Sequence, residues 1–264
     1  MGTNIELRLL LLLTRHLPRV RGSGQLGHQL ARFYRRKARA SVVSDVLGFR
    51  MRLNPMEYVD GDILFVPQIC ERAERRILER ALKPGDTFFD IGCHTGFYSL
   101  FVSQLVGRDG RVYAIDADEH SISRLKENIA LNCKTNILPI HSGVSTRHEV
   151  LPFGLNLRGN RGASSFRRAG QATTRVPCYP LLHFMRQYGV GAVRGAKLDI
   201  EEMGYDVLRH FFDEADVTLY PQILIVEKED GLREFLGTRG YRMVAESGLN
   251  WSFNLERRGP GPMR

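Results

Sequence analysis

The segment from Thr87 to Gly96, TFFDIGCHTG, decides the fold class of this chain. Its first five residues form a short, mostly apolar run, which predicts a buried strand over residues 87–91. Gly92 and Gly96 then allow a tight turn into a predicted helix that runs to Val106. A strand that leads through a glycine-containing turn into a helix is typical of the repeating unit of a parallel α/β sheet.

The downstream sequence repeats this alternation. Further apolar strands are predicted over residues 111–116, 137–141, 196–200 and 223–227. Helices are predicted over residues 71–82, 119–131, 205–215 and 232–239. The last two strands, over residues 241–245 and 251–255, have no helix between them and predict an antiparallel hairpin at the sheet edge. The sequence therefore predicts an α/β fold with a doubly wound, mostly parallel sheet.

Residues 1–52 are predicted to form a basic, mostly helical N-terminal extension of a domain over residues 53–264. Between Arg15 and Arg52 there are ten basic residues and one acid, Asp45. Within this span a helix with one basic face is predicted from the spacing of four apolar residues, Leu26, Leu30, Phe33 and Tyr34. Residues 49–53 alternate like a strand. A second departure lies over residues 149–176, which are rich in Gly, Arg and Ser and predict an inserted loop or hairpin near the mouth of the site.

Charge and cysteine content limit the partners and the compartment. The net charge of +9 favours an anionic partner, such as nucleic acid, an anionic membrane surface or an acidic substrate, although solubility alone also explains it. The leucine run over residues 9–13 is too short to span a bilayer, and its flanks do not fit an export signal. Four cysteines without metal-type spacing predict neither a zinc site nor disulfides. We therefore expect a cytoplasmic protein, and peripheral contact with a membrane stays open.

The acidic and glycine residues around the first strand predict the ligand. Asp90, Gly92 and Gly96 are spaced D-x-G-x-x-x-G at the carboxyl edge of the sheet, where open α/β sheets bind ligands. His94 occupies the second glycine position of a dinucleotide fingerprint, and no phosphate-loop lysine follows. Asp116 ends the next strand, 20 residues after Gly96, where a carboxylate can accept hydrogen bonds from ribose hydroxyls. S-adenosylmethionine, which has a ribose and no phosphate, fits these features; a structural turn with a capping aspartate is the alternative.

Two further carboxylates follow the predicted strand over residues 196–200. Asp199 and Glu201 lie two residues apart, so a strand would place both on one side of the sheet edge, together with Lys197. A carboxylate at that edge can act as a general base on a substrate hydroxyl or hold the substrate. The alternative is an exposed loop with helix-capping acids.

In combination these stretches resemble the FkbM-type methyltransferases, a family with the class I S-adenosylmethionine-dependent fold. The resemblance rests on residues 90–99, 112–116, 197–205 and 225–227. It implies S-adenosylmethionine as the cofactor, with Asp116 on its ribose and with Asp199 and Glu201 near the reacting centre. The residues that it implies in the cofactor loop are Asp90, Gly92, Cys93, His94, Thr95 and Gly96.

The chain departs from the family pattern at three places. Cys93-His94 replaces the usual Ala-Asn, and Asp116-Ala117 replaces the usual Glu-Pro. Glu202 stands where the family often has glycine after the Asp-x-Glu sequence.

The resemblance implies transfer of a methyl group to a hydroxyl oxygen, because members of the family act on hydroxyls of polyketides, sugars and surface glycans. We expect a small-molecule, glycan or lipid-linked acceptor, which the Arg-rich residues 158–168 would suit if it is anionic. No metal is expected. Two alternatives stay open: a nucleic-acid methyltransferase, which the net charge favours, and a non-catalytic binding protein on this fold, which Glu202 suggests. The sequence leaves the acceptor and the oligomeric state open.

Overall fold

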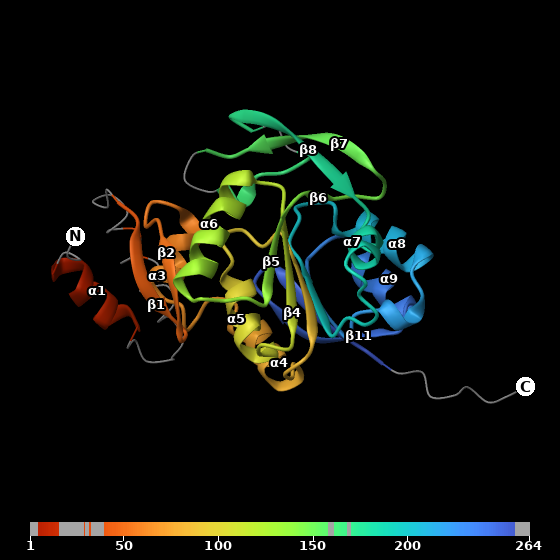
Figure 1. Cartoon of the computed structure of the whole chain (residues 1–264), viewed down its shortest axis with the longest axis horizontal. Helices are drawn as coiled ribbons and strands as arrows, with labels where there is room; N and C mark the ends of the chain where they lie inside the picture. Colours follow the sequence, from red (N-terminus) through yellow and green to blue (C-terminus); the bar gives the residue numbers. More distant parts are fainter. Residues whose placement is uncertain are drawn as a thin grey trace, which may run out of the picture.

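A computed structural model describes residues 5–15, 29, 32, 40–157, 161–167 and 170–256. Its centre is a seven-stranded sheet with the order β11-β12-β10-β9-β3-β4-β5 (Figure 1). The strands are β3 (Thr87–Ile91), β4 (Arg111–Asp116), β5 (Ile137–His141), β9 (Gly195–Leu198), β10 (Ile223–Glu227), β11 (Tyr241–Ser247) and β12 (Asn250–Leu255). In this sheet β12 runs antiparallel to both neighbours and the other pairs are parallel. The predicted mostly parallel sheet with a closing hairpin is confirmed.

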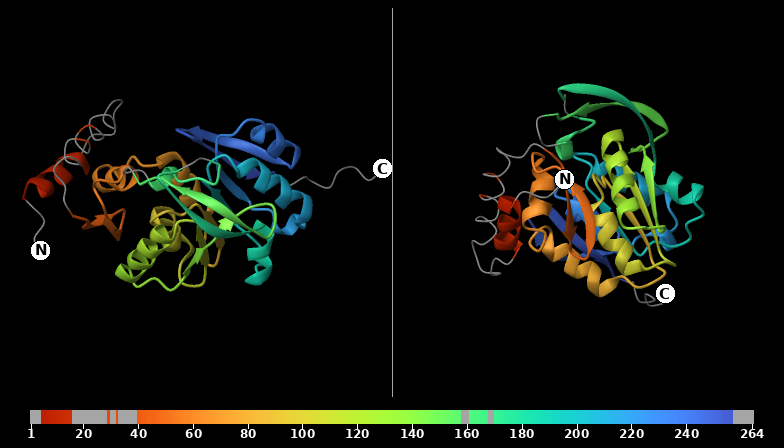
Figure 2. Two further views of the ribbon diagram at one scale, coloured as in Figure 1. Left: turned by 90° about the horizontal axis from the view of Figure 1, so that it is seen from above. Right: turned by 60° about the vertical axis from the view of Figure 1, so that its left-hand side comes forward.

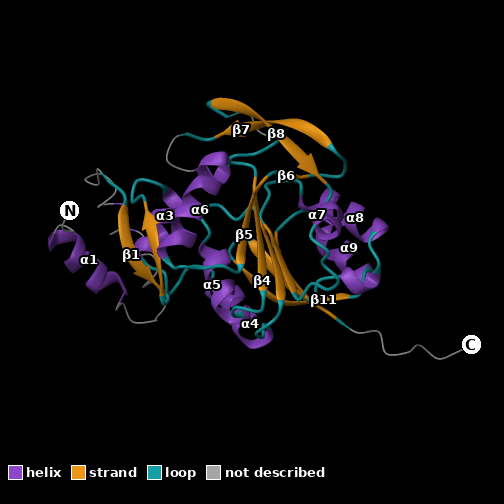
Figure 3. Ribbon diagram, in the orientation of Figure 1, coloured by secondary structure: helices purple, strands orange, loops and turns teal. Residues whose placement is uncertain are grey.

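Helices cover both faces of the sheet (Figure 3). One face carries α4 (Arg72–Ala81), α5 (Phe97–Val106) and α6 (Glu119–Leu131), and the other carries α7 (Leu181–Gln187), α8 (Gly204–Glu214) and α9 (Leu232–Thr238). Phe88 and Phe89 show why the sheet needs both layers: successive side chains point to opposite faces, and both rings are fully buried, one in each core.

The N-terminal segment packs against the α4–α6 side of the sheet. It contains α1 (Ile5–Arg15), the antiparallel pair β1 (Val42–Val46) and β2 (Phe49–Leu53), and α3 (Tyr58–Phe65). Leu7, Phe49 and Met51 are buried in the core that α5 and α6 share. The predicted strand over residues 49–53 is confirmed, whereas the four apolar residues of the predicted helix near residue 30 lie outside the described residues. The division of the chain at residue 52 stays a prediction.

A small three-stranded sheet stands over the carboxyl ends of the central strands (Figure 2). It has the order β6-β8-β7 and is formed by β6 (Gly143–Val144), β7 (Glu149–Leu155) and β8 (Ala172–Tyr179). The connection between β7 and β8 contains the short 3₁₀ helix η1 (Arg161–Ala163), and a second one, η2 (Val217–Leu219), precedes β10. The predicted insertion over residues 149–176 is thus a hairpin.

Candidate active site

Four acidic residues lie where four neighbouring strands end. Asp90 and Asp116 belong to β3 and β4, Asp199 follows β9 directly, and Glu227 ends β10. A cleft of about 640 Å³ opens at this edge, and Asp116, Asp199 and Glu227 all line it. The β7–β8 hairpin covers part of the cleft and contributes Phe153 to its wall. The cleft is in the size range of small-molecule and cofactor sites.

Both glycines of the loop after β3 are required by close contacts. Gly92 has a φ of +78°, and a Cβ atom there would lie 1.9 Å from the carbonyl oxygen of Asp199. Gly96 has a φ of +91°, and its Cβ would lie 2.2 Å from Cδ1 of Leu125 on α6. Any side chain at Gly92 would therefore separate the β3 loop from the β9 loop, which are the two segments that the sequence predicts at the site.

Asp116 lies between the β3 loop and the cleft. Its Oδ2 accepts a hydrogen bond from the His94 backbone N–H at 2.7 Å, and its Oδ1 accepts one from the Asp118 N–H at 2.8 Å. Burial raises the pKa of Asp116 to about 7, against the opposing effect of these two N–H groups. Each carboxylate oxygen keeps a second lone pair, so the residue can still accept hydrogen bonds from two adjacent hydroxyls.

The other loop residues predicted to bind cofactor divide into two groups. His94 has a φ of +48° and lines both the large cleft, beside Asp116, and an adjoining cavity of about 380 Å³. Asp90, Cys93 and Thr95 line the smaller cavity and not the large cleft. Burial raises the pKa of Asp90, which accepts a hydrogen bond from Ser99 Oγ at 2.5 Å. Asp90 therefore lines the smaller cavity, and one of its carboxyl oxygens already accepts a hydrogen bond.

α3 is tied to the β3 loop by a buried carboxylate that the sequence analysis missed. Asp60 is fully buried; it accepts a hydrogen bond from Thr95 Oγ1 at 3.2 Å and pairs with Arg124 of α6 at 2.7 Å. Asn128 of α6 donates to the Thr95 carbonyl at 3.0 Å. These contacts hold α3, which lines both cavities, against the β3 loop and α6. No local sequence pattern identifies Asp60 as the residue that joins these three segments.

Lys197 is a buried cation among carboxylates. Its Nζ lies 2.5 Å from Asp199 Oδ2 and 4.9 Å from the centre of the Tyr98 ring, and the residue is 4% exposed. Burial alone would lower the pKa of Lys197, but Asp199, Glu71 and Asp90 outweigh it and raise the pKa. Lys197 thus stays charged and holds the half-exposed Asp199 carboxylate at the junction of the two cavities.

The loop after β9 differs from the sequence prediction. The strand ends at Leu198, not at residue 200, and the loop that follows contains Glu201 and Glu202, which take left-handed φ values of +40° and +64°. Asp199 and Glu201 both line the large cleft all the same. The second of these φ values gives a physical reason for the glycine that the family often has at residue 202.

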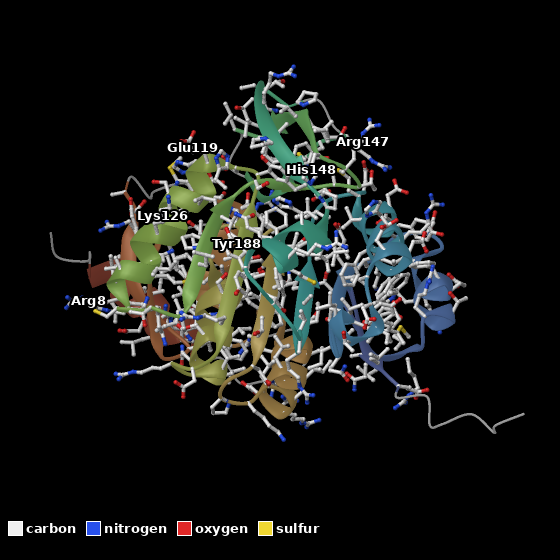
Figure 4. All side chains as sticks on the ribbon, turned by 45° about the vertical axis from the view of Figure 1, so that its right-hand side comes forward. Arg8, Glu119, Lys126, Arg147, His148 and Tyr188 are labelled. Carbon is white, nitrogen blue, oxygen red and sulfur yellow. The ribbon has the colours of Figure 1, made fainter. Side chains whose placement is uncertain are left out.

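Glu202 provides a stability prediction. A left-handed conformation destabilises a residue that has a side chain by roughly 1–2 kcal/mol. Glycine removes this cost but also makes the unfolded chain more flexible, which offsets part of the gain. We therefore expect Glu202→Gly to raise the free energy of unfolding by about 0.5–1 kcal/mol. Urea unfolding would measure it. Lys126→Gly, in the middle of α6 on an exposed side (Figure 4), should lower the same quantity by about 1 kcal/mol. A loss of stability in Glu202→Gly would contradict the strained conformation.

Two more carboxylates, Glu71 and Glu227, lie at the cleft. Glu71 lies at the N-terminus of α4, lines both cavities and accepts a hydrogen bond from Asn250 Nδ2 at 3.2 Å; burial raises its pKa. The residue after Glu227, Lys228, pairs through its Nζ with Glu246 at 2.7 Å. Oε2 of Glu227 is buried without a hydrogen-bond partner among the described residues. Burial, and then the charges of Asp199 and Glu201, raise the pKa of Glu227 to about 7.

The Arg-rich segment is only partly visible. Arg158 and Arg168 lie outside the described residues. Arg167 pairs with Asp206 of α8 at 2.6 Å, and both side chains are half exposed. An exposed pair of this kind contributes little to stability, and a role of the segment in binding an anionic group stays a prediction.

The residues at the cleft fit S-adenosylmethionine. Carboxylates outnumber the cations at both cavities, where Arg72 lines the large cleft and Lys197 the smaller cavity, and this excess of acids suits a sulfonium and an ammonium group. Asp116 offers acceptors for a ribose, and the smaller cavity holds the buried Tyr98 hydroxyl, which has no hydrogen-bond partner among the described residues. An unpaired buried hydroxyl is costly, so a polar ligand group in this cavity would remove that cost. Within the described residues, no cluster of His, Cys, Asp or Glu could hold a metal ion.

The comparison with known families agrees with this geometry. The family described as "Methyltransferase FkbM domain" matches residues 90–247, more than half of the chain, from Asp90 in β3 to Ser247, the last residue of β11. The chain belongs to the FkbM methyltransferase family. It is therefore a methyltransferase-family protein with the predicted class I fold, and S-adenosylmethionine is its cofactor.

Individual relatives of this FkbM protein match over short stretches. Arsenite methyltransferase of Halobacterium salinarum is 39% identical over 57 residues, 22% of this chain and 15% of that protein. Ribosomal protein L11 methyltransferase of Caldanaerobacter subterraneus is 37% identical over 62 residues, 24% of this chain and 19% of that protein. The chain thus spans less than a quarter of the length of either relative. The M. jannaschii TYW2 structure in complex with AdoMet has a TM-score of 0.41 and 12% identity, and the match covers 81% of this chain and 83% of that chain.

Proposed function

We propose that this FkbM-family protein transfers a methyl group to a hydroxyl oxygen of a polyhydroxylated acceptor, such as a sugar or a glycan, and that Glu227 is the general base. The observation that carries the proposal is the Glu227 carboxylate, which lines the cleft and has a buried oxygen with no hydrogen-bond partner among the described residues. A hydroxyl that donates to this oxygen would satisfy it. A base with a pKa near neutral pH is also well matched to proton transfer.

The chemistry of the cleft wall favours a polyol over an anion at the acceptor end. Glu71, Asp199, Glu201 and Glu227 line this cleft together with Asn250, the first residue of β12, and one cation, Arg72. Carboxylate and amide oxygens accept hydrogen bonds from hydroxyls, whereas a phosphate beside four carboxylates would be repelled. This arrangement speaks against a nucleic-acid acceptor.

Different residues of the chain have different proposed roles in the methyl transfer. S-adenosylmethionine supplies an electrophilic methyl group on a sulfonium. Asp116 would hold the ribose, and the β3 loop, kept close to Asp199 by Gly92, would fix the distance to the acceptor. Asp199 is engaged by Lys197 and so is suited to orient a neighbouring hydroxyl, while Glu201 would contact the acceptor from the loop. Glu227 would take the hydroxyl proton as the new C–O bond forms and the C–S bond breaks.

An acceptor screen tests this function. The full chain would be incubated with S-adenosylmethionine and separate panels of methyl glycosides, oligosaccharides, transfer RNA and ribosomal RNA, and the products analysed by mass spectrometry. We expect one added methyl group on a glycoside or oligosaccharide hydroxyl and none on RNA. Methylation of RNA alone would contradict the proposal. Binding of S-adenosylmethionine without transfer to any acceptor would instead favour the non-catalytic alternative.

A further inference from the structure

Glu74, in the first turn of α4, is a buried acid to which the proposed reaction gives no role. It is 2% exposed and lines the large cleft but not the smaller cavity. Its Oε1 accepts hydrogen bonds from Ser247 Oγ and, at 3.4 Å, from Asn250 Nδ2. Its Oε2 is buried and has no hydrogen-bond partner among the described residues. A carboxylate oxygen that has lost its water without gaining a donor is destabilising, so a donor from a ligand would stabilise it.

A second acid lies beside Glu74. Glu71, three residues earlier in the chain, lines the same cleft and accepts a hydrogen bond from the same amide, Asn250 Nδ2, at 3.2 Å. Burial raises the pKa of Glu71, and the charge of Glu74 adds to this rise. The positive end of the α4 dipole favours an acid at this position, but it gives Glu74 Oε2 no hydrogen-bond donor.

The basic residues near these two acids do not pair with them. Among the described residues, no ion pair joins either acid to Arg72, which also lines the cleft. Arg75 is buried, and its guanidinium donates to carbonyl oxygens of the loop before α4. Lys197 attracts Glu71 but is paired with Asp199. The two acids therefore leave an excess of negative charge in the cleft wall, which a cationic group of a ligand would compensate.

This pair of acids lies close to the proposed general base. Asn250 is the register partner of Glu227 between β12 and β10, so the two side chains share one face of the sheet with their Cβ atoms about 5 Å apart. The Asn250 amide in turn bonds to both Glu71 and Glu74. A ligand with a hydroxyl at Glu227 therefore needs to extend over only the length of a sugar ring or two to place another polar group at Glu74.

We propose that Glu74, together with Glu71, forms a subsite for a protonated amine, and that the acceptor is an amino sugar or another polyol with a free amino group. An ammonium group has three donors and no acceptor, so it can bond to Glu74 Oε2 and to Glu71, whereas a hydroxyl has a single donor. N-acetylation would remove the charge and leave one N–H. The inference rests on the proposed transfer to a hydroxyl and narrows the class of acceptor.

Binding of matched glycosides to the full chain tests the subsite. Isothermal titration calorimetry would use protein saturated with S-adenosylhomocysteine, at a pH below the pKa of the amines. The ligands would be the methyl glycosides of glucosamine, galactosamine and mannosamine, each beside its N-acetylated form and its neutral parent sugar. We expect at least one amino glycoside to bind about tenfold or more tightly than its two counterparts, because hydrogen bonds to charged groups are the stronger ones.

The variant Glu74→Gln keeps an acceptor for Ser247 and Asn250 but removes the charge. It should reduce the preference for the amino glycoside to within about threefold and leave the affinity for the neutral sugar unchanged. The matched control is Glu79→Gln, which changes an exposed glutamate of the same helix and should bind like the wild type. If circular dichroism shows that Glu74→Gln is unfolded, Glu71→Gln replaces it, with a loss of preference in the same direction.

Three results would overturn the subsite. One is wild-type protein that binds no amino glycoside, or binds it no better than its counterparts. Another is a folded Glu74→Gln variant that retains the preference. The third is about a tenfold loss of affinity for S-adenosylhomocysteine in this variant, which would assign the two acids to the ammonium group of the cofactor.

Failure of the proposed function would give a different result. An amino glycoside that binds through Glu74 but receives no methyl group would leave the subsite in place and contradict transfer to a hydroxyl. Methylation of a neutral glycoside with no preference for the amine would support the transfer and reject the subsite.

Discussion

Asp116→Ala is expected to weaken binding of S-adenosylmethionine about 100-fold. The substitution removes the carboxylate proposed to hold the ribose, and hydrogen bonds to a charged group contribute about 1.5–3 kcal/mol each. It also leaves the backbone N–H groups of His94 and Asp118 without their acceptors, which loosens the loop that lines the cleft. Isothermal titration calorimetry with S-adenosylmethionine, and with S-adenosylhomocysteine as a second ligand, measures the change.

The design separates loss of binding from loss of folding. Asp116→Glu restores a carboxylate of the type that the FkbM family usually has at this position, so it should bind the cofactor within a few-fold of the wild type. Asp109→Ala, at an exposed turn, should have no effect. Thermal unfolding of each variant reports the structural contribution. A Kd for Asp116→Ala within about threefold of the wild-type value would reject the proposed position of the ribose.

Glu227→Gln is expected to lower kcat about 100- to 1,000-fold, the range typical for loss of a general base. The KM for S-adenosylmethionine should change little, because Glu227 lines the cleft and is proposed to contact the acceptor, not the cofactor. Since the base must be ionised, the wild-type rate should rise with pH through the pKa of Glu227, about 7, and level off above it. The amide cannot titrate, so the variant should lose this rise. Release of S-adenosylhomocysteine at saturating acceptor and saturating S-adenosylmethionine, over a range of pH, measures both effects, because saturation removes the contribution of cofactor binding at Asp116, whose pKa is also about 7.

Two control variants distinguish Glu227 from its neighbours. Glu246→Gln removes the exposed partner of Lys228 and should retain the wild-type rate and pH profile. Asp199→Asn weakens the pair with Lys197 and should raise the KM for the acceptor more than it lowers kcat, because Asp199 is assigned to orientation. If Glu227→Gln keeps the wild-type profile and Asp199→Asn abolishes the rise with pH, the base is Asp199 and the proposed division of roles is wrong.

The acids of this site reach one cleft through the order of the strands. β10, β9, β3 and β4 are adjacent in the sheet although long stretches of sequence separate them. Asp90 lies opposite Lys197 in the β3–β9 register, and β4 ends with Asp116 beside the loop that follows β3. The charge of Lys197 compensates part of the negative charge that this order concentrates. A parallel sheet therefore assembles a binding site for a cationic cofactor from residues that are not neighbours in sequence.

The sequence alone determined the strands and helices that carry this fold, because period and glycine placement are local properties. The segments over 87–91, 111–116, 119–131 and 223–227 have the bounds that the pattern predicted. Asp116 at the end of its strand could be named for the same reason. Tertiary structure decided the rest: that Lys228 turns to Glu246, that Glu227 keeps an unpaired buried oxygen, and that Asp60 joins three segments. These depend on burial and on partners distant in the chain, which fix a pKa or a hydrogen bond only after the layers have packed.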